Sequence, residues 1–271
     1  MFFNRPDPEK TGLNHPKIKD GNYAMDYAFR GCLQANIKGG SFTGQYPFYA
    51  AKSPEISGGQ FTTDFSFYAA ENPRIRGGIF SGKMAFYGAF SPLVEGGDFL
   101  GKWSFCESQG ASIAAGRFQE EGAFSEAVKI TVNGGLFSGP DFGIMSRQMV
   151  VRGGDFSGPG FMKHSQNALI LGGRFNGAAS FENARNLRVL INGTIPEIIN
   201  PLSGIIAAKK IGRIVFEKGK PSEVIIISES VDEGAEYADR IESGCVPAPP
   251  SEPVQALKTL QALADSIRDK H

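Results

Sequence analysis

The chain has 271 residues, and its 28 Lys plus Arg balance 28 Asp plus Glu, so that its formal net charge is zero. With no run of five or more like charges, it lacks the basic surface of a nucleic-acid binder or of a protein that binds anionic membranes. No segment approaches the about 18 consecutive apolar residues of a spanning helix. Three cysteines without CxxC spacing cannot all pair, which favours a cytoplasmic protein in a reducing compartment.

Residues 1–17 are the first predicted segment. They contain prolines and charged residues, and they lack the apolar core of a secretory signal. An open end of stacked strands is an unpaired sheet edge that promotes aggregation. We therefore expect residues 1–17 to cap the N-terminal end of the fold that follows.

Residues 18–230 are dominated by a 19-residue repeat. A phenylalanine recurs at this interval without insertion at Phe42, Phe61, Phe80, Phe99, Phe118, Phe137, Phe156 and Phe175. Six residues after this phenylalanine a second column holds mostly Phe. Nine residues after it the residue is always small, and fourteen residues after it the residue is Ile or Val. A constant period predicts identical coils that stack roughly 4.8 Å apart, with each phenylalanine on the one below.

Turn residues divide each coil into short strands. A glycine pair such as Gly58-Gly59 precedes most of the phenylalanines, and Ser53-Pro54 is typical of a second bend. The 19-residue period does not fit leucine-rich or helical repeats, and parallel crossovers are almost always right-handed. The sequence thus predicts an all-β fold, a right-handed single-stranded parallel β-helix (solenoid) of about ten coils.

One phrase carries a family resemblance. QYPFYAAKSPEISGGQF has an inward Phe48, the turn at Ser53-Pro54, and Ile56 before a new phenylalanine. It resembles the coil consensus of the DUF3737 family, and the resemblance covers roughly residues 18–200. It implies a bacterial protein of unknown function in the right-handed, pectate-lyase-like β-helix class, and it carries over no catalytic residues.

The C-terminal part departs from the repeat. An irregular segment, 194–227, is expected to close the last coil, and residues 231–252 form an acidic, Pro-containing linker. Residues 253–271 are predicted to form an amphipathic helix, with Leu257, Leu260, Ala264 and Ile267 on one face. We expect this face to pack on the flank of the solenoid; the alternative is a homodimer formed through the helix.

The first candidate site is aromatic. Tyr49, Tyr68 and Tyr87 each follow an inward phenylalanine, so strand alternation points them outward. Three residues before them on each coil lie Tyr46, Phe65 and Met84, and Trp103 continues that column. Such a strip could stack on sugar rings or form a protein interface. Alternatively, it stabilises the stacked coils or is covered by the C-terminal helix.

The second candidate site is catalytic. Glu107 and Glu126 lie one coil apart, about 5 Å, and His164 lies two coils further on, with Arg147 and Asp141 nearby. Pectate-lyase-like solenoids often cleave polysaccharides with such groups on one outer face. The alternative is a solvated polar stripe. Three scattered histidines do not suggest a metal site, and no cofactor is expected.

Two functions follow from these candidates. The leading hypothesis is a non-enzymatic structural or binding solenoid that presents Tyr49, Tyr68, Tyr87 and Trp103 to a carbohydrate or protein partner, with no nucleic-acid or membrane partner. The alternative is a carbohydrate-active enzyme, a polysaccharide lyase or glycoside hydrolase, that uses Glu107, Glu126 and His164. An open aromatic strip favours binding, whereas a covered one leaves a scaffold.

Overall fold

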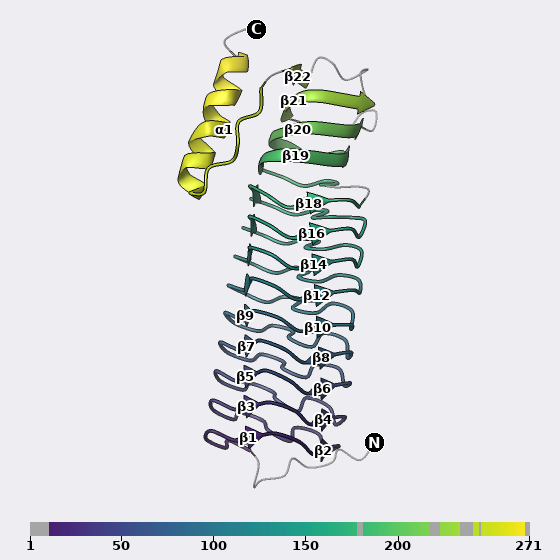
Figure 1. The fold of residues 1–271 in the computed structure, drawn as a ribbon, viewed down its shortest axis with the longest axis vertical. Helices are drawn as coiled ribbons and strands as arrows, with labels where there is room; N and C mark the ends of the chain where they lie inside the picture. The colour runs from purple at the N-terminus through teal and green to yellow at the C-terminus, as the bar shows by residue number, and fades with distance from the viewer. Residues whose placement is uncertain (1–10, 178–180, 217–222, 234–240, 244, 269–271) are drawn as a thin grey trace.

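The structure is a computed structural model, and it describes residues 11–177, 181–216, 223–233, 241–243 and 245–268. Successive coils of a parallel β-solenoid rise from the N-terminal end, and one helix, α1 (Pro253–Arg268), lies beside the last strands (Figure 1). The predicted all-β solenoid with a C-terminal helix is confirmed. The right-handed sense of the winding stays a prediction, and the first ten residues of the predicted N-terminal cap lie outside the described residues.

One face of the solenoid is a 13-stranded parallel sheet. Its two-residue strands are β1 (Lys17–Ile18), β3 (Asn36–Ile37), β5 (Glu55–Ile56), β7 (Arg74–Ile75), β9 (Leu93–Val94), β11 (Ser112–Ile113), β13 (Thr131–Val132), β15 (Val150–Val151) and β17 (Leu169–Ile170). Its later strands are β19 (Leu187–Ile199), β20 (Ser203–Val215), β21 (Glu223–Glu233) and β22 (Ile241–Ser243).

The second face is a 9-stranded parallel sheet of two-residue strands. They are β2 (Asn22–Tyr23), β4 (Ser41–Phe42), β6 (Gln60–Phe61), β8 (Ile79–Phe80), β10 (Asp98–Phe99), β12 (Arg117–Phe118), β14 (Leu136–Phe137), β16 (Asp155–Phe156) and β18 (Arg174–Phe175). A third line of parallel bridges, from Asn14 to Arg185, gives each coil its remaining wall.

Stacked aromatic rings fill the interior. Phe61 and Phe80 pair in register, their ring centres lie 4.8 Å apart, and both are fully buried. The second phenylalanine column meets the first edge to face, as between Phe61 and Phe67 at 5.1 Å. The predicted vertical stacking is therefore confirmed, and the coil spacing set by the backbone ladder also sets the ring spacing.

The glycine pairs form the corner between the two sheets, and the two positions of a pair require glycine for different reasons. A Cβ on Gly58 would lie 2.2 Å from the backbone oxygen of Lys38, so the first position has no room for a side chain. Gly59 has a φ of 105°, which L side chains rarely adopt. The predicted bend at Ser53 is also left-handed, with a φ of 49°.

The prediction of an irregular segment at 194–227 is wrong, because long regular strands form most of this region. This region contains the end of β19 and all of β20, each of 13 residues, and the start of the 11-residue β21. The 19-residue spacing ends at Val189, which pairs with Ile206, 17 residues on; Ile206 then pairs with Ile226, 20 residues on. Long runs rich in Ile and Val favour continuous strands. The end of β21 and all of β22 lie within the predicted linker, 231–252.

Helix α1 packs on the outer side of the 13-stranded sheet. Ala256, Leu260 and Ala264 are fully buried there against side chains that include Leu169 and Leu190. The expected packing on the flank is confirmed, but Leu257 is 41% exposed, because the buried face is turned by one residue to Ala256. A homodimer through this helix stays a prediction. No helix in the described part of the chain is long and apolar enough to cross a bilayer.

Candidate functional site

The predicted tyrosines form a continuous ladder on the outside of three successive coils. The ring centres of Tyr49 and Tyr68 lie 5.3 Å apart at an interplanar angle of 7°, and those of Tyr68 and Tyr87 lie 5.4 Å apart at 11°. The rings are half-buried. The coil repeat alone positions them, because each tyrosine follows an inward phenylalanine in register.

A second aromatic ladder runs beside the first. Tyr27, Tyr46 and Phe65 stack with centres 5.2 Å apart, and each has a left-handed backbone conformation, with φ between 54° and 56°. The two ladders touch edge to face, as between Tyr46 and Tyr68 at 6.1 Å. Between them lies a shallow groove of about 490 Å³. We call this surface the aromatic strip: Tyr27, Tyr46, Tyr49, Phe65, Tyr68, Met84 and Tyr87.

Stacking leaves little of the ring faces open. Tyr68 is stacked on both sides. Tyr49 is stacked on Tyr68 from one side, and the guanidinium carbon of Arg30 lies 5.4 Å from its ring centre. A partner would therefore meet mainly ring edges and hydroxyl groups.

The C-terminal helix does not cover the aromatic strip. Helix α1 contacts β19 and β20, at the opposite end of the solenoid from Tyr49 and Tyr68 (Figure 1). The alternative in which this helix covers the strip is wrong, because the apolar residues of the helix are buried on Leu169, Leu190 and their neighbours. Among the residues that the structure describes, none covers the strip, and its half-buried rings line a groove that opens to solvent.

Hydrogen bonding and burial raise the pKa of two tyrosines of the strip, Tyr87 and Tyr46. The Tyr87 hydroxyl donates a hydrogen bond to the Glu107 carboxylate, and this contact raises the pKa of Tyr87 above its ordinary value. Burial is the main cause that raises the pKa of Tyr46, followed by the neighbouring Tyr27, Tyr68 and Asp64. Both hydroxyl groups are therefore protonated at neutral pH, and that of Tyr87 uses its one donor on Glu107.

The predicted catalytic residues lie in one exposed column. Glu107, Glu126 and His164 all have left-handed φ angles near 55° and are exposed. Met145 occupies the coil between Glu126 and His164. Glu107 is engaged by Tyr87, and among the described residues no hydrogen bond or ion pair joins Glu126 to His164. Asp141 pairs with Lys163 at 3.3 Å, and Arg147 is exposed.

Trp103 extends the column of Tyr46 and Phe65 beyond Met84. Its indole lies over Gly122, where a Cβ would come within 2.2 Å of the indole Cδ1. Gly122 thus leaves room for the ring, and the aromatic column ends there. Trp103 also lines a small pocket of about 260 Å³. Met84 lines both this pocket and the groove of the aromatic strip.

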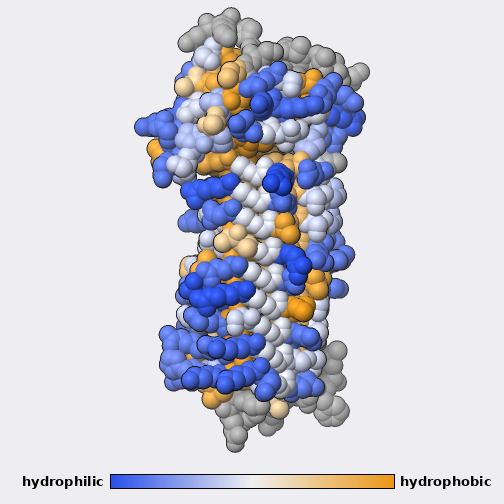
Figure 2. Space-filling view, viewed as in Figure 1, coloured by the Kyte–Doolittle hydropathy of each residue, from blue (hydrophilic) through white to orange (hydrophobic). Residues whose placement is uncertain are grey.

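Sequence reasoning did not predict a second groove, which follows the glycine corner. It has a volume of about 710 Å³, and glycines such as Gly135 and Gly154 line it. Figure 2 shows it as a near-neutral stripe that runs up the solenoid, with mostly hydrophilic side chains on its left and a mixture of hydrophilic and hydrophobic ones on its right. Arg117 on its rim donates to both oxygens of Asp98, one at 2.6 Å, so these rim charges satisfy one another.

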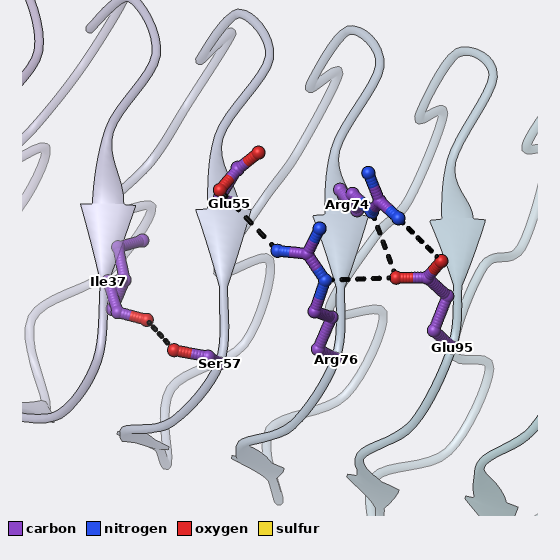
Figure 3. Close-up of polar contacts among 6 residues, drawn as sticks. All are labelled: Ile37, Glu55, Ser57, Arg74, Arg76 and Glu95. Carbon is purple, nitrogen blue, oxygen red and sulfur yellow. Dashed lines mark hydrogen bonds and ion pairs between the residues drawn. The ribbon is translucent and has the colours of Figure 1, made fainter.

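The outer side of the 13-stranded sheet carries a ladder of ion pairs (Figure 3). Arg74 donates to both carboxylate oxygens of Glu95, at 2.7 and 2.9 Å, and Arg76 bridges Glu95 and Glu55. The hydrogen bond from Arg74 lowers the pKa of Glu95. These groups link neighbouring coils and leave no free charge for a ligand at this place. Within the described ranges, no group of three or more His, Cys, Asp or Glu residues could hold a metal ion.

Comparison with known proteins gives one result. The family model described as "Protein of unknown function (DUF3737)" matches residues 92–227. The phrase at 45–61 that carries the resemblance in the sequence lies before this range. No curated protein and no solved structure matches the chain.

Proposed function

Because the chain belongs to the DUF3737 family, whose description names no activity, we propose its function from its surface alone: a non-enzymatic binding solenoid whose aromatic strip contacts a protein partner. The observation that carries this proposal is the open strip of two stacked ladders. Tyrosine is enriched in protein interfaces, and a Tyr hydroxyl supplies a polar contact beside a large apolar ring.

The geometry of the rings favours a protein over a carbohydrate. Aromatic rings carry a negative face and a positive edge. In the strip, Tyr68 uses both faces for stacking and Tyr49 has Arg30 on its second face, so few faces remain for a sugar ring to stack on. Ring edges and hydroxyl groups suit edge-to-face contacts with partner aromatic residues and hydrogen bonds to partner carbonyl groups.

The alternative, a carbohydrate-active enzyme, gains no specific support. Its proposed acid and base need to converge on one bond. Glu107 accepts a hydrogen bond from Tyr87, and Met145 lies between Glu126 and His164. This arrangement fits the solvated polar stripe better than a catalytic set.

The test uses a photo-crosslinking amino acid in cells that express the chain natively. Placed at position 68, it should crosslink to one discrete protein; placed at position 90, where Phe90 is 53% exposed, it should not. That protein, once purified, should bind the wild-type chain and lose at least about 30-fold in affinity for the Tyr49→Ser/Tyr68→Ser/Tyr87→Ser variant, as expected for interface hot spots.

The matched control is Phe90→Ser, which removes an exposed aromatic residue outside the strip and should leave binding unchanged. Circular dichroism must first show that each variant is folded. Equal binding by wild type and the triple variant refutes the proposal. A glycan that binds the wild type on an array and loses binding in the triple variant would replace the protein partner with a carbohydrate.

A further inference from the structure

The pocket beside Trp103 continues the aromatic strip and differs from it in charge. We call it the Trp103 pocket; Met84, Trp103, Glu121, Glu126, Asp141 and Met145 are among the residues that line it. Met84 also lines the groove of the aromatic strip. A partner chain that lies along the strip can therefore reach the pocket without a break in contact.

One carboxylate in this pocket lacks a countercharge. Lys102 binds Glu121 at 3.0 Å, and Lys163 binds Asp141 at 3.3 Å while also lying 3.9 Å from Glu182. Glu126 is exposed, and in the part of the chain that the structure describes it makes no ion pair. The pKa of the neighbouring Cys106 is raised to about 11, mainly by burial and then by the carboxylates of Glu107 and Glu126.

The size and walls of the pocket restrict its occupant. Pockets for drug-sized ligands measure about 300–1,000 Å³, whereas this one has about 260 Å³. It is thus better matched to a single side chain. Met84, Ile144 and Met145 provide apolar surface for an aliphatic stem, and Trp103 provides an indole.

We propose that the Trp103 pocket binds an arginine side chain of the protein that occupies the aromatic strip. A guanidinium stacks on aromatic rings and binds carboxylates with a fixed fork of donors, which suits the combination of Trp103 and Glu126. Its stem would lie against Met84 and Met145. The identity of the partner's anchor rests on the proposed function, but the preference of the pocket can be measured without the partner.

Trp103 is the single tryptophan of the chain, so its fluorescence reports on this pocket directly. The probe is acetyl-arginine methylamide, titrated into the full chain. We expect a saturable change in emission with the arginine probe and none with the neutral citrulline analogue. The lysine analogue should bind at least several-fold more weakly, because an ammonium lacks the planar fork.

Glu126→Gln should weaken the arginine probe by about tenfold or more, since hydrogen bonds to charged groups are among the stronger ones. Glu120→Gln is the matched control: it removes the same charge from an exposed residue outside the pocket and should change the affinity little. Equal binding of the citrulline or lysine analogue, or full affinity in Glu126→Gln, overturns the arginine assignment.

The two proposals fail in different ways. Loss of the fluorescence response with intact tyrosine-dependent crosslinking would remove the arginine anchor and leave the proposed function in place. A partner that binds independently of Tyr49, Tyr68 and Tyr87 would refute the proposed function, and with it the assignment of the anchor to that partner, even if the arginine probe binds. With both tests positive, mutation of each arginine in the purified partner should identify one whose loss mimics Glu126→Gln.

Discussion

Removal of one ring from the middle of the phenylalanine column gives the sharpest test of how the solenoid is held together. Phe80 is fully buried. Its ring stacks between Phe61 at 4.8 Å and Phe99 at 5.0 Å, and it meets Phe86 and Phe67 edge to face at 5.1 and 6.1 Å. Phe80→Ala removes all four ring contacts at once.

The expected cost lies at the high end for this kind of substitution. Phe→Ala changes in protein cores cost about 3–5 kcal/mol in total. This total includes the lost aromatic pairs, each of which contributes about 0.5–1.5 kcal/mol, so a ring with four such pairs belongs at its upper end. The backbone ladder pairs Phe61, Phe80 and Phe99 in strict register, so the coils cannot close the gap without breaking hydrogen bonds. We therefore expect a loss of about 4–5 kcal/mol, a large fraction of a typical 5–15 kcal/mol.

Urea unfolding followed by circular dichroism measures this loss. The control is Phe90→Ala, ten residues further on, where a 53% exposed side chain should cost at most about 0.5 kcal/mol. The m-value must be compared as well, because a solenoid can lose cooperativity and unfold in parts. A loss below about 1 kcal/mol for Phe80→Ala, or equal losses for the two variants, would refute the claim that stacked rings stabilise the coils.

Two further predictions concern two glycines in turns and the cysteine thiols. Gly82→Ala places a Cβ 1.8 Å from the backbone oxygen of Thr63 and should lower the free energy of unfolding by about 3 kcal/mol or more. Gly88 has open space around it but a φ of 62°, so Gly88→Ala should cost only about 1 kcal/mol. Urea titration of both variants tests the difference. Burial raises the pKa of Cys32 to about 12 from an ordinary value of 9.0, whereas Cys245 is exposed, so a thiol reagent at pH 8 should modify Cys245 quickly and Cys32 only after unfolding. Because the raised pKa belongs to the folded state, its stabilising contribution is fully present below pH 9 and falls as the pH rises toward 12; a Cys32→Ala variant that showed the same fall would contradict this assignment.

The periodic part of the fold can be predicted from the sequence, because an inward phenylalanine that recurs at a constant interval shows that every coil has the same length. Phe61 and Phe80 stack as their spacing predicts, and Gly58-Gly59 turns the chain as expected. The left-handed backbone at Phe65 and Ala69 was not predictable, because bulky or ordinary residues do not signal a positive φ. Hydrogen bonds between neighbouring coils hold that conformation, such as the one from the Phe65 amide to the Lys83 carbonyl.

The end of the repeat was predictable only in position. Loss of the phenylalanine column after Phe175 signals a change, but nothing in the spacing indicates that β19 and β20 become 13-residue strands. Their pairing depends on contacts across coils of unequal length, including a shift in register between Ile191 and Thr194. The same limit applies to α1, where helical periodicity gave a helix but placed Leu257 on the buried face.

The candidate site was predictable column by column and not across columns. The stacking of Tyr49, Tyr68 and Tyr87 follows from the period. The hydrogen bond from Tyr87 to Glu107 joins side chains from two predicted sites that had been treated as independent. The Trp103 pocket was missed for the same reason, since Glu126 comes from another column than Trp103 and Asp141, and the three residues lie on different coils.

This division explains where a solenoid can carry specificity. The interior requires the same ring at each turn, so Phe80 and its equivalents cannot vary without a cost in stability. The outward columns have no such requirement, because the backbone ladder forms whatever they carry. The aromatic strip is confined to a few coils and ends where Cys106 follows Tyr87 and Gly122 follows Trp103. The proposed recognition surface, with its aromatic stretch and the carboxylate of Glu126, therefore rests on departures from the repeat, and substitutions at these departures should change the proposed binding and leave folding intact.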